Sequence, residues 1–260
     1  MSNALRAEWI KLRTVLMHWI LVIIAVAFPL IVTLLTAFFN GDNDNQFDAF
    51  TANDLVQVLT GTSVVAGLLL AVMAAASITG EFGFNTIRPT LSAVPSRTRV
   101  AAAKAIVLLV VTAVVQGTVI LVGAFVGKAV AEGRGSTIDF GERSSLVPAL
   151  VGTVVLAMLL SLFGLGIGLL LRSTPGAISL IVLWPLLIES LVGGLLALAT
   201  DNEDVVNWLP FRAGAQLTNT DIGGEFSGGG PSRIVGGIYF GAVAVALVVL
   251  GTMSLRRRDA

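Results

Sequence analysis

The sequence predicts an all-α integral membrane protein with six transmembrane helices, and three observations lead to this fold class. Hydrophobic residues make up 55% of the 260 residues and charged residues only 12%, whereas an ordinary soluble domain has about 25% charged residues. The mean hydropathy is +0.91, so too little polar surface is present to coat a water-soluble particle. The third observation is a set of apolar stretches that are long enough to cross a bilayer.

These stretches define the predicted spans. A transmembrane helix needs about 20 mainly apolar residues, because the hydrocarbon layer is about 30 Å thick. None of the predicted spans contains Lys or Arg, and Glu189 is the one acidic residue inside them. Pro29 and Pro185 lie within spans and are expected to kink or locally unwind them. The six stretches cover approximately residues 16–39, 55–78, 105–127, 146–171, 177–199 and 234–255.

Residues 1–15 precede the first span and predict an amphipathic helix. Leu5, Trp9, Leu12 and Leu16 recur every three or four residues, with basic residues between them. This pattern suits a helix that lies in the headgroup layer of the membrane, where Trp is enriched. The alternative is that these residues simply extend the first span.

The distribution of basic residues predicts the orientation, because Lys and Arg near span ends favour the cytoplasmic side. Eleven of them fall on the side that holds both termini and the loop of residues 80–104, and five fall on the other side. Twelve acidic residues lie in the loops 40–54, 128–145 and 200–233 of that other side, which leaves Glu8, Glu81 and Asp259 on the basic side. Both termini are therefore expected in the cytoplasm, and residues 200–233 form an extracellular loop.

The loop of residues 80–104 predicts a short surface helix. Phe84, Ile87 and Leu91 recur at helical spacing, Asn85 is an expected cap of a helix that begins near Thr86, and Pro89 restricts where that helix starts. In the extracellular loop, residues 205–217 are too apolar for a solvated segment. They are expected to re-enter the outer leaflet or to cover the outer end of a cavity.

Several kinds of chemistry are not expected on this chain. The phosphate-binding pattern G-x-x-x-x-G-K-[ST] does not occur, so no ATP site is predicted. With one His and no Cys, no metal site and no catalytic residues are predicted. Glu189 has two interpretations, since a carboxylate in a span costs about 2.5–3.5 kcal/mol on insertion scales. It lies on a translocation path or at a subunit contact, or it is a protonated side chain that bonds a neighbouring helix.

The loop of residues 80–104 resembles the loop between spans two and three in the type-two permeases of bacterial ABC transporters. Other parts of the chain match the same family in order, from residues 8–14 to the closing residues 256–259. The segments that carry the resemblance are GEFGFNTIRPTL (80–91), VPSR (94–97), AK (103–104), EWIKLRT (8–14), LLRST (170–174), WPLLIE (184–189) and RRRD (256–259).

The resemblance implies a permease subunit in the bacterial plasma membrane that works as a dimer, with an identical copy or a paralogue. It implies two copies of a separate cytoplasmic ABC ATPase, which carry ATP and Mg²⁺, while this chain has no cofactor. It also implies a coupling helix between spans two and three. The expected partners are the ATPase, the second permease and membrane lipid, with no nucleic acid. The residues expected to contact the ATPase are Glu81, Phe82, Phe84, Thr86, Ile87, Arg88 and Leu91.

The expected function is export of an amphipathic drug, antibiotic, peptide or lipid-like molecule. Family members are mostly exporters, and the apolar spans favour an amphipathic cargo. Two alternatives belong to other classes. A secondary transporter would carry paired broken helices at matching positions of two halves, and Pro29 and Pro185 do not form such a pair. A membrane scaffold or immunity protein would have no path for Glu189 to line.

Overall fold

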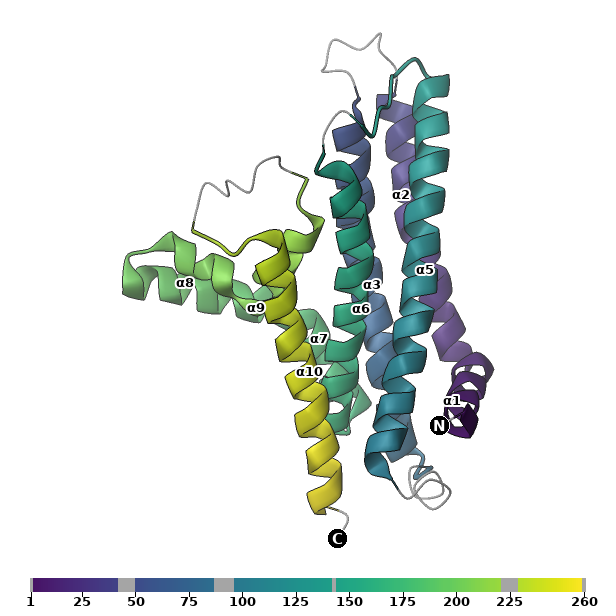
Figure 1. The fold of residues 1–260 in the computed structure, drawn as a ribbon, viewed down its shortest axis with the longest axis vertical. Coiled ribbons are helices and arrows are strands. Elements are labelled where there is room, and N and C mark those ends of the chain that lie inside the picture. Colours follow the sequence, from purple (N-terminus) through teal and green to yellow (C-terminus); the bar gives the residue numbers. More distant parts are fainter. Residues whose placement is uncertain (1, 42–49, 87–95, 142–143, 221–228, 259–260) are drawn as a thin grey trace.

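The computed structural model describes residues 2–41, 50–86, 96–141, 144–220 and 229–258, and every regular element in these ranges is helical. Six helices of this described part are long and apolar enough to cross a membrane, which confirms the predicted fold class. They correspond to α2 (Leu16–Asn40), α3 (Ala52–Gly83), α5 (Arg97–Gly133), α6 (Leu146–Leu171), the segment Thr174–Thr200 and α10 (Arg233–Arg258). Both termini lie at the same end of the bundle (Figure 1).

The first helix, α1 (Ser2–Thr14), is separate from α2. The chain is extended at Val15, with φ −91° and ψ 117°, so α1 does not continue the first span. Leu12 is buried in a core cluster, and Leu5 packs against the same cluster. Of the four residues of the predicted apolar face, Leu5 and Leu12 therefore pack on the bundle, whereas Trp9 and Leu16 are 48% and 72% exposed. The helix lies at the end of the bundle where both termini lie (Figure 1). Its position relative to a membrane stays a prediction.

The centre of the bundle is formed by α3 and α6, which are the most buried of the long helices. They approach closely because Gly164 lies against α3. A Cβ atom at Gly164 would be 2.1 Å from the carbonyl oxygen of Ala71. Gly164 and Gly168 are four residues apart on α6, and such pairs of small residues let membrane helices approach closely. A Cβ atom at Gly168 would be 2.7 Å from Cγ2 of Ile78 and 3.0 Å from the carbonyl oxygen of Ala75.

The segment Thr174–Thr200 is not one straight helix. It starts as α7 (Thr174–Leu183), passes through a π-helical turn (Trp184–Ile188) and continues as α8 (Glu189–Thr200). Pro185 lies in that turn and has no backbone N–H to donate, which explains the break that the sequence predicted. Beyond the turn, α8 lies crosswise to the long helices and extends away from them (Figure 1).

The chain returns from α8 through a 3₁₀ turn (Glu203–Trp208), the short helix α9 (Pro210–Ala215) and a second 3₁₀ turn (Gln216–Thr218). The apolar stretch of residues 205–217 is thus packed on the protein. The ring of Phe211 lies 5.0 Å from that of Phe163 in α6 and 5.1 Å from that of Phe240 in α10, measured between centroids. This aromatic contact holds α9 against the bundle.

Candidate functional site

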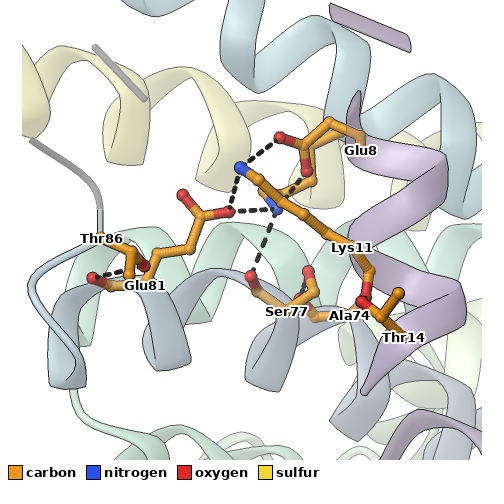
Figure 2. A network of polar contacts seen from close by, with 8 residues as sticks. Glu8, Lys11, Thr14, Ala74, Ser77, Glu81 and Thr86 are labelled. Carbon is orange, nitrogen blue, oxygen red and sulfur yellow. Dashed lines mark hydrogen bonds and ion pairs between the residues drawn. The ribbon is translucent and has the colours of Figure 1, made fainter. Parts of the chain in front are cut away.

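A buried cluster of four charged side chains joins three helices at the end of the bundle where both termini lie (Figure 2). Lys11 Nζ of α1 lies 2.9 Å from Glu8 Oε1 and 3.0 Å from Glu81 Oε1 of α3. Lys104 Nζ of α5 contacts Glu8 Oε2 and lies 2.9 Å from Glu81 Oε1. Two carboxylates and two ammonium groups alternate, so the charges of the cluster balance.

The cluster is largely shielded from solvent. The side chains of Glu8, Glu81 and Lys104 are 4%, 8% and 4% exposed, and that of Lys11 is 38% exposed. Lys104 Nζ also donates a hydrogen bond to the Ser77 carbonyl oxygen, at 3.2 Å. Removing one partner of such a buried pair is costly because it leaves an uncompensated charge. The cluster therefore fixes α1, α3 and α5 relative to one another.

The surroundings keep both residues of α1 charged at neutral pH. Burial by itself raises the pKa of Glu8, but the charges and hydrogen bonds of Lys104 and Lys11 outweigh it and hold the pKa below the usual 4.5. For Lys11, burial by itself lowers the pKa, because it disfavours the charged ammonium group. The contacts with Glu8 and Glu81 outweigh this effect and raise the pKa of Lys11 above 10.5. The ion pair between Glu8 and Lys11 is thus present throughout the physiological pH range.

Glu81 lies near the end of α3 and Lys104 about two turns inside α5, so the cluster joins the two helices that flank the α3–α5 connection. At its start, α3 ends in a turn in which Thr86 N–H donates to the Glu81 carbonyl oxygen (2.9 Å) and Asn85 N–H donates to that of Phe82 (3.2 Å). Asn85 has φ 56°, a left-handed conformation that Asn tolerates at helix C-termini. Phe84 is the C-cap of α3, and Asn85 is the left-handed residue that follows it. The start of a helix near Thr86 falls outside the described residues.

The seven residues predicted to contact an ATPase lie in different surroundings. Phe84 is 83% exposed and Thr86 is exposed, as a contact surface requires. Phe82 is half-buried, with the Arg172 guanidinium 5.0 Å from its ring centroid. Glu81 is buried, because its carboxylate contacts Lys11 and Lys104 in the charged cluster, so it does not offer an exposed contact. Ile87, Arg88 and Leu91 lie outside the described residues.

Glu189 lies at the start of α8, and its side chain contacts α9. Its carboxylate accepts hydrogen bonds from the N–H groups of Phe211 (2.7 Å) and Arg212 (3.1 Å). These are free N–H groups at the start of a helix, where an anionic acceptor is favourable. A contact with a neighbouring segment is one part of the second interpretation of Glu189, and both interpretations of its role stay predictions. Both carboxylate oxygens act there as hydrogen-bond acceptors, whereas the second interpretation has a protonated side chain as the donor.

Sequence reasoning missed the charged cluster, since Glu8, Lys11 and Lys104 were seen only as flanking charges. One signal was present. Glu8 and Glu81 are two of just three acids on a side that holds eleven basic residues, and such isolated acids are candidates for specific ion pairs. No group of three or more His, Cys, Asp or Glu in the described part of the chain is placed to hold a metal ion.

The fold defines a multi-pass membrane protein in which buried ion pairs join α1, α3 and α5. Over residues 4–201 the chain matches the family model of the ABC-2 family transporter proteins, and it belongs to that family. It is thus a permease component of an ABC transporter, and the family associates with an ABC ATPase. The match extends from α1 to the end of α8 and leaves α9 and α10 outside it. Neither a curated protein nor a solved structure matches the chain.

Proposed function

We propose that this chain forms, as a dimer, the translocation pathway of an ABC exporter, and that a cytoplasmic ATPase drives it by binding the α3–α5 loop. The observation that carries the proposal is Phe84. This large aromatic side chain is 83% exposed at the first turn beyond a buried ion-pair cluster, in a chain of the ABC-2 family. Exposed aromatic side chains commonly anchor protein interfaces by filling a pocket of the partner.

The proposed contact surface consists of Phe84 and Thr86 together with Ile87, Arg88 and Leu91 of the loop. Two residues that precede Phe84 anchor this surface on the bundle. The ring of Phe82 contacts Arg172, and the carboxylate of Glu81 belongs to the charged cluster. ATP and Mg²⁺ are bound by two ATPase copies, and this chain binds neither. With both termini in the cytoplasm of a bacterial cell, as the basic residues favour, the loop faces the ATPase.

Movement of the loop reaches the membrane through the charged cluster. When ATP closes the two ATPases, they pull the two docked loops toward each other. Because Glu81 and Lys104 are bound to Glu8 and Lys11, α1 moves with the ends of α3 and α5. The helices then tilt as rigid bodies and alternate the pathway between inward and outward access. The cargo proposed is an amphipathic drug, antibiotic, peptide or lipid-like molecule, in keeping with the apolar helices.

Co-purification with the ATPase subunit tests the docking surface. The double variant Phe84→Asp/Ile87→Asp removes two apolar anchors and places charges in their pocket. We expect binding to weaken by at least ~2 kcal/mol, roughly thirtyfold. The matched control is Thr137→Asp, which adds a charge at an exposed residue of the α5–α6 connection and should leave co-purification intact. Unchanged binding of the double variant contradicts the assignment.

For Glu189, we propose that the carboxylate, which follows the π-helical turn, holds α9 in place. A variant of this residue distinguishes that structural role from a role on the translocation path. Glu189→Gln keeps one acceptor oxygen for the two N–H groups. If the variant transports as well as the unmodified protein, Glu189 is structural. If transport falls while the purified variant remains folded, the carboxylate acts on the path or at the subunit contact.

The two other classes are less well supported. A secondary transporter would have broken helices at matching positions of two halves. The fifth segment breaks at Trp184–Ile188, but α2 runs without interruption from Leu16 to Asn40 despite Pro29. A scaffold or immunity protein has no need for an exposed aromatic side chain beside a buried ionic cluster.

A further inference from the structure

An apolar groove of about 230 Å³ lies between α1, α2, α3 and α5. It is separate from the charged cluster and from the proposed docking surface. Valine side chains of α5 form one wall, and the residues at the α1–α2 junction form the other. The lining residues that the structure describes are Trp9, Leu12, Arg13, His18, Trp19, Val22, Met73, Val110, Val111, Val114 and Val115.

Hydrogen bonds across the α1–α2 junction preform the groove. The indole Nε1 of Trp19 donates to the Arg13 carbonyl oxygen, at 2.8 Å. Nδ1 of His18 donates to the Leu12 carbonyl oxygen, at 3.2 Å. Both bonds link the start of α2 to the end of α1 across the break at Val15. The angle between these helices, and with it the groove, is therefore fixed without a ligand.

The groove combines apolar walls with one cation. Arg13 carries the one formal charge among the described lining residues, its side chain is exposed, and it forms no ion pair with a described acid. Trp9 and Trp19 are each about half exposed, and Trp side chains concentrate at the headgroup level of membranes. An apolar slot next to a free guanidinium at this level matches a lipid with an anionic headgroup.

The size of the groove favours a lipid chain over a transported molecule. Sites that enclose a drug-sized ligand have volumes of roughly 300–1,000 Å³, and this groove is smaller. Val110 and Val114 on its α5 wall are 56% and 63% exposed, so the groove opens sideways toward the space that lipid occupies. A single acyl chain can enter from that side while its headgroup remains at Arg13.

We propose that this groove binds one acyl chain of an anionic phospholipid, whose phosphate is held by Arg13, in the leaflet where α1 lies. The bound lipid would act as a fixed part of the wall between α1 and α5. The proposal rests on the groove and its cation, and it stands whether or not the α3–α5 loop docks an ATPase.

Quenching of tryptophan fluorescence by brominated lipids tests the proposal. In a Trp184→Phe/Trp208→Phe background the remaining emission comes from Trp9 and Trp19, which flank the groove. The protein is reconstituted in phosphatidylcholine vesicles that contain a small, equal fraction of either brominated phosphatidylglycerol or brominated phosphatidylcholine. We expect an apparent preference of about fivefold for the anionic lipid, the factor that corresponds to the ~1 kcal/mol given by one basic residue near an anionic surface.

Two kinds of variant separate groove binding from general attraction to the surface. Arg13→Gln should abolish the preference, whereas the matched control Arg6→Gln, another exposed basic residue of α1 outside the lining, should keep it. Val114→Phe fills the groove from its exposed side and should also remove the preference for the anionic lipid. If Val114→Phe does not fold, Val110→Phe tests the same wall of the groove. Equal quenching by the two lipids in the unmodified protein overturns the proposal. So does loss of the preference in Arg6→Gln to the same extent as in Arg13→Gln.

Discussion

Lys104 is the central residue of the charged cluster, because its ammonium group contacts both carboxylates and the Ser77 carbonyl. Its position one residue before the predicted third span gave no sign of this role. The sequence shows charges near span ends, but a contact between residues 8, 81 and 104 depends on how α1 folds back on the bundle. Such long-range pairing is set by packing, which single-sequence patterns do not encode.

Replacement of Lys104 by Met is expected to lower the free energy of unfolding by about 3–5 kcal/mol, because two buried carboxylates then face each other with only Lys11 to compensate them. Denaturant unfolding of the purified protein measures the effect. Lys128→Met is the control. Its pair with Glu132, at 3.4 Å, is between exposed side chains and is worth at most ~0.5 kcal/mol. A similar small loss in both variants would show that the buried cluster does not stabilise the fold.

The pH dependence of stability gives a second prediction. Glu8 has a pKa below 4.5 in the folded protein, so its contribution is present above that pH and is lost as the pH falls through the lower folded value. Lys11 has a pKa above 10.5, so its contribution is present below that pH and is lost as the pH rises through the higher folded value.

We therefore expect stability to fall on the acid side, and Glu8→Gln to make that fall less steep. Thermal unfolding midpoints, measured from neutral pH down to acid pH in both proteins, test this. If the two acid limbs have the same slope, Glu8 is not the titrating group.

Among the helices, the contact between α3 and α6 depends on the absence of a side chain at Gly164. Gly164→Ala places a Cβ atom 2.1 Å from the Ala71 carbonyl oxygen, and a backbone atom cannot yield without moving a helix. We expect a loss of about 1–3 kcal/mol. At Gly117 nothing lies within 4 Å of an added Cβ, so Gly117→Ala should be neutral or up to ~1 kcal/mol stabilising. Denaturant unfolding measures the change in the free energy of unfolding for both variants. Equal changes would contradict the close packing of α3 against α6.

The sequence located the long helices well and their ends poorly. Apolar length marks the part that fits the hydrocarbon, and helices continue beyond it. The predicted third span begins at residue 105, but α5 begins at Arg97. The predicted second span begins at residue 55, but α3 starts after Thr51, which forms a capping box with Asp54. Pro185 predicted a break in the fifth segment, but no local pattern states in which direction the chain continues, so the crosswise α8 was not foreseen.

For the molecule as a whole, the sorting of basic residues predicts which end faces the cytoplasm. The chain contains no Cys, so a thiol reagent can react only with a cysteine that is introduced by substitution. In intact cells a membrane-impermeant thiol reagent should label Thr137→Cys, in the α5–α6 connection, and should not label Arg99→Cys, at the start of α5. Both residues are exposed, and both should react once the cells are permeabilised. The reverse pattern in intact cells would invert the orientation.

We propose that an ATPase docked on the α3–α5 loop drives this permease. The most direct measurement is ATP hydrolysis by the partner ATPase subunit, reconstituted in vesicles with either the unmodified chain or the Phe84→Asp/Ile87→Asp variant. We expect the unmodified chain to stimulate hydrolysis and the folded double variant to give no stimulation. Equal stimulation by both proteins would contradict this proposal.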